Sequence, residues 1–226
     1  MKRGPKPKSK VKIKWSENFA YAMGLIATDG NVSPDGRHIN FTSKDLEQID
    51  NYQKTLGIQC NIGKKGSGSV TEKKYYVLQF SDIFFHQFLE SIGIGRAKSK
   101  SLGFVDIPSK YFFDFLRGCF DGDGTFYSYW DPRWRSSYMF YIEFVSASKK
   151  HVDWLRLELK NRIGVFGHVT GDGNKLAYQL KYAKKEAVEI IKKMYYNRKV
   201  VCLSRKRTKI ERALDIEKQQ QKEYKR

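Results

Sequence analysis

Two Asp-Gly pairs at matching places carry the residues best suited to chemistry. Asp29 and Asp123 each end a helical pattern, 94 residues apart, and each precedes a glycine. A carboxylate in the last turn of a helix faces the negative end of the helix dipole, which costs about 0.3–1 kcal/mol. Two such acids repel each other if they meet, unless a proton or a cation lies between them. Two carboxylates completed by phosphate and water suit Mg²⁺, so the pair predicts a metal site that acts on phosphate.

The alternative interpretation is an ordinary turn, since Asp-Gly is a common turn sequence. For one pair alone we would favour that interpretation. Two pairs at the same place in a repeated helix favour a functional site.

The residues before the acids predict two helices that pack closely. One apolar helical face runs from Ser16 to Asp29 and another from Ser109 to Asp123, so we expect a serine N-cap and a glycine stop on both. Small residues line one face of each helix, namely Ala20, Gly24 and Ala27 in the first and Gly118 and Gly122 in the second. Glycine inside a helix costs about 0.5–1 kcal/mol relative to alanine and is tolerated where another backbone must approach. We therefore expect each glycine face to pack on the other helix about a pseudo-twofold axis.

The chain downstream of the first helix is repeated downstream of the second. Residues 39–44 resemble residues 142–149, and residues 56–58 resemble residues 163–165. Lys98 corresponds in the same way to Lys206. One unit of helix, hairpin, helix, hairpin and helix has therefore been duplicated, with a longer hairpin loop at 129–137. Apolar patterning predicts strands at 39–42, 75–80, 139–145 and 177–182, and further helices at 46–56, 83–92, 151–163 and 183–196.

The amino-acid composition limits the kinds of partner that this protein can bind. The 226 residues include 43 Lys and Arg against 24 Asp and Glu, a formal charge of +19, which points to a polyanion and most often to nucleic acid. No apolar run approaches the roughly 20 residues of a membrane span. Cys60, Cys119 and Cys202 lie far apart, which predicts a reduced intracellular protein, in cytoplasm or organelle matrix and not secreted.

The two motifs resemble those of one family. Residues 22–30 read Ala-Met-Gly-Leu-Ile-Ala-Thr-Asp-Gly and residues 116–124 read Leu-Arg-Gly-Cys-Phe-Asp-Gly-Asp-Gly. Both are similar to the motif that names the LAGLIDADG homing endonucleases, and the resemblance to the two-motif, monomeric type extends over about residues 15–212. In that family the acid before the final glycine is the metal ligand, and both copies keep it. The first copy departs from the motif at Ala27, a position that commonly varies.

The resemblance implies a fold and a reaction. The fold would be α+β, with duplicated αββαββα units and two saddle-shaped antiparallel sheets along the DNA major groove. A monomer would hydrolyse one phosphodiester in each strand of a double-stranded target of about two helical turns, which promotes intron homing. Mg²⁺, as two or three ions shared by Asp29 and Asp123, would activate water, with the backbone carbonyls of Thr28 and Gly122 as further ligands. Mn²⁺ would substitute, and Ca²⁺ would bind without cleavage.

The family also places a basic residue near each metal site, and by position these would be Lys98 and Lys206. Both lie in basic stretches, so a phosphate contact or a solvated charge is an equal alternative for either lysine. Candidate DNA contacts are outward strand residues, a lysine pair expected at a hairpin tip, and an arginine-rich loop: Asn40, Thr42, Lys44, Lys64, Lys65, Gln79, Arg133, Arg135, Glu143, Lys149, Gln179 and Lys181.

We expect four parts in the chain. A basic leader at 1–14 precedes the first unit at 15–105 and the second at 106–212, and a charged tail follows at 213–226, with a frayed helix from Arg205 onward. A binding protein on the same scaffold remains the alternative function, either an RNA-splicing maturase or a DNA-binding regulator. A basic architectural protein would explain the charge but neither the duplication nor the paired acids.

Overall fold

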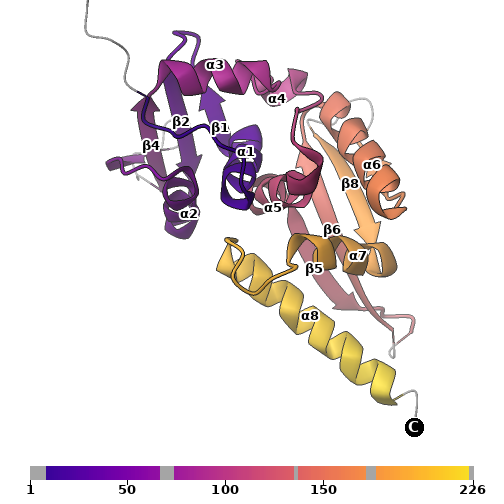
Figure 1. The fold of residues 1–226 in the computed structure, drawn as a ribbon. Helices are drawn as coiled ribbons and strands as arrows, with labels where there is room; N and C mark the ends of the chain where they lie inside the picture. The colour runs from indigo at the N-terminus through magenta and orange to yellow at the C-terminus, as the bar shows by residue number, and fades with distance from the viewer. Residues whose placement is uncertain (1–8, 67–73, 135–136, 172–176, 224–226) are drawn as a thin grey trace, which may run out of the picture.

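The computed structural model describes residues 9–66, 74–134, 137–171 and 177–223 and shows two repeated units (Figure 1). The first unit contains α1 (Glu17–Asp29), β1 (Gly30–Val32), β2 (His38–Ser43), α2 (Leu46–Leu56), β3 (Ile62–Lys65), β4 (Tyr75–Ser81), α3 (Ile83–Ser91) and α4 (Lys98–Ser101). The second contains the 3₁₀ turn η1 (Ser109–Tyr111), α5 (Phe112–Asp123), β5 (Thr125–Trp130), β6 (Tyr138–Ser146), α6 (Lys149–Ile163), β7 (His168–Thr170), β8 (Tyr178–Ala183), α7 (Lys184–Met194) and α8 (Ser204–Glu223). The predicted helices and strands are present, with ends that differ by at most two residues, apart from the beginning of α5.

Each unit holds a four-stranded antiparallel sheet. The strand order is β1-β2-β4-β3 in the first and β5-β6-β8-β7 in the second, so the two sheets have the same topology. One face of each sheet is apolar and packs on helices, as Phe41 and Leu78 do in the first sheet and Ile142 and Leu180 in the second. The predicted α+β fold with two antiparallel sheets is confirmed.

The motif helices α1 and α5 lie side by side between the sheets (Figure 1). A Cβ added to Gly24 would lie 2.1 Å from the Phe115 carbonyl oxygen, and one added to Gly118 would lie 2.1 Å from the Tyr21 carbonyl oxygen. Real Cβ atoms do not approach so closely, so these positions exclude every residue except glycine. The predicted packing of the glycine faces is confirmed.

The glycines that follow the two motif helices do not have the backbone conformation that was predicted for them. Gly30 and Gly124 have φ of −79° and −75°, which is extended backbone and not the left-handed form of a C-capping glycine. A Cβ on Gly30 would instead lie 2.7 Å from the Ile26 carbonyl oxygen, and one on Gly124 would lie 2.6 Å from that of Phe120. Glycine is present because each chain turns back closely over the last turn of its helix.

One predicted N-cap is correct and the other is wrong. Ser16 caps α1, since its hydroxyl oxygen accepts the Phe19 N–H at 3.1 Å. Ser109 lies instead in η1, and α5 begins three residues later. The Ser109 hydroxyl oxygen accepts a bond from the Arg162 guanidinium at 2.6 Å and caps no N–H group of α5.

Both ends of the described chain are attached to the units. The backbone N–H groups of Lys10 and Val11 donate to the Asp82 carboxylate at 2.6 and 2.9 Å, and Val11 is buried. Instead of the predicted frayed tail, α8 is a continuous helix with Ile210 and Ala213 buried in the core. In the part of the chain that the structure describes, no helix is both long and apolar enough to cross a membrane.

Candidate active site at the ends of the motif helices

Asp29 and Asp123 are the last residues of α1 and α5, at the same end of the helix pair. A Cβ on Gly122 would lie 3.0 Å from the Asp29 Oδ2 atom, so Asp29 reaches across to the partner helix. Burial, followed by the negative charge of Asp123, raises the pKa of Asp29 to about 6. Asp123 is exposed to solvent, yet partial loss of water raises the pKa of its carboxyl too. The two acids share one electrostatic environment that opens to solvent.

Two lysines meet these acids. Lys98 and Lys206 are only 6% and 9% exposed. Neither lysine is therefore a solvated charge, which was one of the alternatives for them. Burial lowers the pKa of both ammonium groups to about 8, and the charges of Asp29 and Asp123 oppose this shift. The site therefore combines two carboxylates whose pKa values are raised with two amines whose pKa values are lowered.

The lysines also contact the ends of the motif helices. The Lys206 Nζ atom donates to the carbonyl oxygens of Phe120, Gly122 and Gly124 at 2.6, 3.2 and 2.7 Å, which places a cation at the negative end of the α5 dipole. The Lys98 Nζ atom donates to the Thr28 carbonyl oxygen at 3.3 Å. The two carbonyls predicted as metal ligands, those of Thr28 and Gly122, thus accept lysine hydrogen bonds here. Each carbonyl oxygen has a second lone pair.

The sequence analysis missed Gln48, which belongs to this site. Its Nε2 atom donates to the Asp29 Oδ2 atom at 3.1 Å and to the Asp121 carbonyl oxygen at 3.3 Å, so it joins the two motif helices. The Ser43 hydroxyl donates to the Gln48 Oε1 atom at 2.7 Å and fixes the amide. The available signal was a polar side chain on the buried face of α2, beside Ile49.

The earlier acid of the second motif, Asp121, is part of the internal structure. Its Oδ2 atom accepts the Tyr21 hydroxyl and the Leu203 N–H, both at 2.7 Å. Burial raises the pKa of Asp121 to about 6. This buried carboxylate therefore ties α1 and the segment before α8 to α5.

Arg117, also within the second motif, is fully buried. Its guanidinium donates to the Asp114 carboxylate at 2.8 Å and to the carbonyl oxygens of Met194 and Val201 at 2.7 and 2.9 Å. It fixes the chain between α7 and α8, which leads to Lys206.

No group of three or more His, Cys, Asp or Glu side chains gathers as a metal site within the described ranges. A cation at Asp29 and Asp123 would need ligands from outside the protein side chains. Phosphate and water oxygens are ligands of that kind for Mg²⁺.

The outer faces of the two sheets differ chemically. In the first sheet the register aligns three amides, those of Asn31, Asn40 and Gln79, and Thr42 lies on the same face. In the second sheet the corresponding row holds Glu143, whose carboxylate lies 3.0 Å from the Lys181 Nζ atom, and the row beside it contains Gln179.

The predicted base readers thus lie on the outer faces, although Glu143 is only 6% exposed and is paired. A cluster of three stacked tyrosines beside it was not predicted, with ring centroids 5.2–6.5 Å apart: Tyr127, Tyr129 and Tyr141. Alternate tyrosines along β5 were the available signal.

The remaining basic candidates lie away from the site formed by the two acids and the two buried lysines. Lys64 and Lys65 are the last paired residues of β3 in the β3–β4 hairpin, and residues 67–69 of the expected tip lie outside the described residues. The other side chains have local partners: Lys44 with the Tyr75 ring, Lys149 with Asp153, and Arg133 with Asp131. Arg135 lies outside the described residues.

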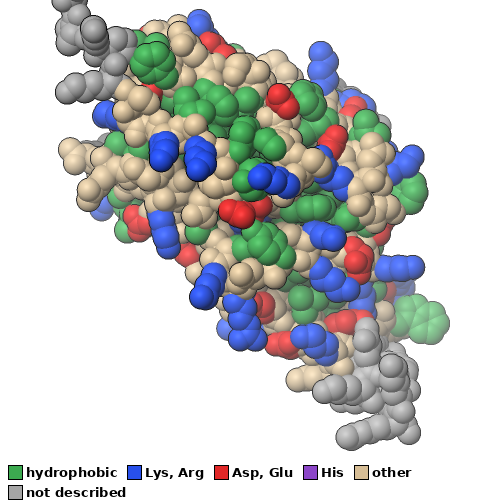
Figure 2. Space-filling model, in the orientation of Figure 1, with side chains coloured by type: hydrophobic (Ala, Val, Ile, Leu, Met, Phe, Trp, Pro, Cys, Tyr) green, Lys and Arg blue, Asp and Glu red, His purple; other side chains and the backbone are tan. Residues whose placement is uncertain are grey.

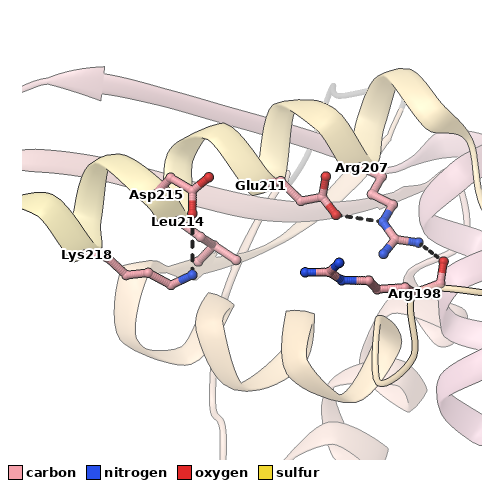
Figure 3. Close-up of a pocket in the computed structure, with 6 residues that line it drawn as sticks. All are labelled: Arg198, Arg207, Glu211, Leu214, Asp215 and Lys218. Atoms are coloured by element: carbon pink, nitrogen blue, oxygen red, sulfur yellow. Dashed lines mark hydrogen bonds and ion pairs between the residues drawn. The ribbon is translucent and has the colours of Figure 1, made fainter.

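The basic residues on the face shown in Figure 2 gather over the region of α8, with acidic residues among them. A groove of about 620 Å³ lies there, lined by Arg198, Arg207, Glu211, Leu214, Asp215 and Lys218 (Figure 3). Two ion pairs within α8, Arg207–Glu211 and Lys218–Asp215, neutralise most of its charge. The groove contains no motif residue.

Comparison with known proteins agrees with this geometry. Residues 16–93 match the model of the LAGLIDADG-like domain family. Residues 16–93 therefore resemble a LAGLIDADG-like domain. The resemblance inferred from the two motifs is confirmed, and a comparison with curated proteins gave no match.

Solved LAGLIDADG structures share the fold of both units. The N-terminal LAGLIDADG domain of DUF199/WhiA is 17% identical, with a TM-score of 0.54 over 82% of this chain and 85% of that chain. I-SmaMI bound to an uncleaved DNA target in the presence of calcium ions is 11% identical, with a TM-score of 0.58 over 91% and 93%. I-DmoI in complex with DNA and Mn is 15% identical, with a TM-score of 0.51 over 80% and 97%. At these identities the likeness establishes the LAGLIDADG fold.

Proposed function

We propose that this protein is a site-specific double-strand DNA endonuclease that acts inside the cell, hydrolyses one phosphodiester in each strand and promotes intron homing. The observation that carries the proposal is the junction where two acids and two buried lysines meet. Buried lysines and mutually repelling carboxylates are costly to fold, and perturbed pKa values cluster at functional sites. I-SmaMI and I-DmoI, which share this fold, were solved with DNA and divalent cations.

The residues at the junction fit a divalent cation. Asp29 and Asp123 offer hard oxygen ligands. A cation between them would remove their mutual repulsion, which adds to the effect of burial on the Asp29 pKa. The second lone pairs of the Thr28 and Gly122 carbonyl oxygens are further candidate ligands. Mg²⁺ or Mn²⁺ would lower the pKa of a bound water and stabilise charge on the phosphate, and Ca²⁺ would support binding without cleavage.

The other groups of the site have roles of their own in the proposal. The Lys98 and Lys206 ammonium groups stabilise negative charge that develops at the scissile phosphates. Gln48 orients the Asp29 carboxylate through its amide N–H. Lys206 also holds the last turn of α5 through its carbonyls, which fixes the direction of Asp123.

Target recognition would use the outer faces of both sheets. Residues 15–105 and 106–212 are proposed as the two units, each covering about one helical turn of a target of about two turns. Since amides line the first sheet and a Glu-Lys pair with tyrosines lines the second, the two half-sites should differ. One chain would then bind one asymmetric site as a monomer, aided by the charge of +19.

A nucleic-acid-binding protein without cleavage, a maturase or a regulator, is the second candidate. The observation that favours it is the fold shared with the N-terminal LAGLIDADG domain of DUF199/WhiA.

Selection of cleaved sites from a randomised duplex library in Mg²⁺ tests the proposal. We expect discrete cut ends on both strands of one long site, absent for Asp29→Asn and Asp123→Asn, with DNA binding retained by both variants. Tight binding of one site without cleavage in Mg²⁺ or Mn²⁺ would refute the nuclease and favour the second candidate.

A further inference from the structure

The segment that leads into Lys206 lies against α2, a helix of the opposite unit (Figure 1). The Asn51 amide donates to the Cys202 carbonyl oxygen at 3.0 Å, and the Ser204 N–H donates to the Glu47 carboxylate at 3.0 Å. The Ser204 hydroxyl donates to the same carboxylate. Lys206 belongs to the second unit, yet its backbone is held by the first.

The reciprocal arrangement holds Lys98. In the first unit, the chain just after α4 lies against α6 of the second unit (Figure 1). The Ser148 hydroxyl donates to the Leu102 carbonyl oxygen at 2.5 Å, and the His151 Nδ1–H donates to the Gly103 carbonyl oxygen at 2.9 Å. The Leu102 N–H in turn donates to the Lys98 carbonyl oxygen at 2.8 Å, so the segment held by α6 is bonded to the backbone of Lys98.

Each lysine thus takes its position from both units. Its ammonium contacts the motif helix of its own unit, at Thr28 for Lys98 and at Phe120 and Gly122 for Lys206. Its backbone is attached to the second helix of the other unit. A shift of one unit relative to the other would therefore move each lysine away from its acid.

We propose that these two cross-unit attachments are positioning devices, in which Glu47 and Asn51 place Lys206 and Ser148 and His151 place Lys98. We call them the α2 clamp and the α6 clamp. The effect on cleavage rests on the proposed function, whereas the positioning of the lysines does not.

The two clamps differ in chemistry. The α2 clamp contains the Glu47 carboxylate and, beside it, an ion pair of 2.7 Å between Arg205 and Asp45 with an arginine side chain that is 63% exposed. Ser148 and His151 of the α6 clamp are 1% and 3% exposed, and burial keeps the imidazole neutral by lowering the pKa of His151 to about 4. Salt screens exposed charges and not buried neutral hydrogen bonds, so salt should loosen the α2 clamp alone.

Lysine labelling in protein free of metal and DNA tests the clamps directly. An amine-reactive ester modifies Lys98 and Lys206 at rates that report their exposure, and mass spectrometry reads each site separately. Asn51→Ala or Glu47→Ala should raise labelling of Lys206 by roughly 2- to 10-fold, the range expected from one net hydrogen bond, and leave Lys98 unchanged. Ser148→Ala should do the opposite.

Control and rescue variants separate positioning from general loosening. Asp215→Asn on α8 removes only an exposed contact with Lys218 and should change neither lysine. His151→Ala should expose Lys98, and His151→Asn, whose amide N–H can reach the same carbonyl oxygen, should restore protection. High salt should raise labelling of Lys206 and not of Lys98 in the wild type. Equal changes at both lysines, or none, would overturn the proposal.

Strand-resolved cleavage of a selected target tests the consequence. In single-turnover reactions at saturating enzyme, α2-clamp variants should slow one strand and α6-clamp variants the other, so that nicked intermediates of opposite polarity accumulate. Equal slowing of both strands would overturn the assignment of one clamp to one lysine. A wild-type protein that never cleaves would refute the nuclease, and labelling would still decide the clamps.

Discussion

Asp29→Asn replaces a carboxylate at the end of α1 by a neutral amide of nearly the same shape, and its effect on stability can be worked out from the structure. The pKa of Asp29 is raised from 3.8 to about 6 by burial and by the charge of Asp123. One pKa unit corresponds to about 1.36 kcal/mol, so ionised Asp29 costs the fold about 3 kcal/mol at neutral pH. The amide avoids this cost and keeps an oxygen that accepts the Gln48 N–H.

The sign of the pH dependence follows from linkage. An acid whose pKa is higher in the folded than in the unfolded state binds protons more tightly when folded, so its contribution to stability falls as pH rises from 3.8 to about 6. In Asp29→Asn this loss of stability with rising pH is absent. The variant and the wild type should therefore be similarly stable at acid pH, and the variant should be more stable by about 1–3 kcal/mol near neutral pH.

Urea unfolding without metal, near pH 4 and near pH 7, measures the difference. Asp153→Asn is the matched control, because that carboxylate is 49% exposed and lies away from the junction. Added Mg²⁺ should stabilise the wild type more than Asp29→Asn, since a ligand stabilises the state that binds it. A variant no more stable than the wild type at neutral pH would refute the reasoning, as would cleavage at the wild-type rate.

Four other measurements address the interface, the lysines and the DNA complex. Gly118→Ala should destabilise the fold by about 3 kcal/mol, because its Cβ would lie 2.1 Å from the Tyr21 carbonyl oxygen. Thermal unfolding measures this loss. Gly103→Ala is the control, because a Cβ there meets nothing within 4 Å. Lys98→Met and Lys206→Met should slow single-turnover cleavage far more than they weaken binding; lower affinity at an intact saturated rate would make them only phosphate contacts. The logarithm of the affinity should fall by about 0.9 per phosphate contact per tenfold rise in salt, and sedimentation should find one chain per duplex, not two.

The sequence predicts the centre of this molecule well, because repetition makes weak local signals specific. A single Gly24 inside a helix says little, but its repeat at Gly118 predicted a helix contact that the structure contains. That contact in turn predicted where Asp29 and Asp123 would meet. The bounds of α2 followed from its apolar spacing alone.

The rest depends on partners that are distant in sequence. Gln48 reads as an ordinary helix residue, and only its contact with Asp29 and α5 makes it part of the site. Ser109 does not cap α5, and its hydroxyl contacts an arginine 53 residues away instead. The helix α8 reads as a charged tail, since its buried apolar residues, such as Ile210 and Ala213, lie scattered among charged ones. No local pattern reports such pairings.

The hydrogen bond from Tyr21 to Asp121 makes the pairing of the two units directional. With the repeat spacing of 94 residues, Phe115 corresponds to Tyr21 and Ala27 to Asp121. Two copies of the second unit would face each buried Asp121 with a phenylalanine, and each carboxylate would lose its hydroxyl donor at a cost of about 1–3 kcal/mol. Halves of the protein made as separate chains should therefore combine with each other rather than with themselves. A hybrid built with half of another LAGLIDADG protein would need that half to supply the missing member of this pair.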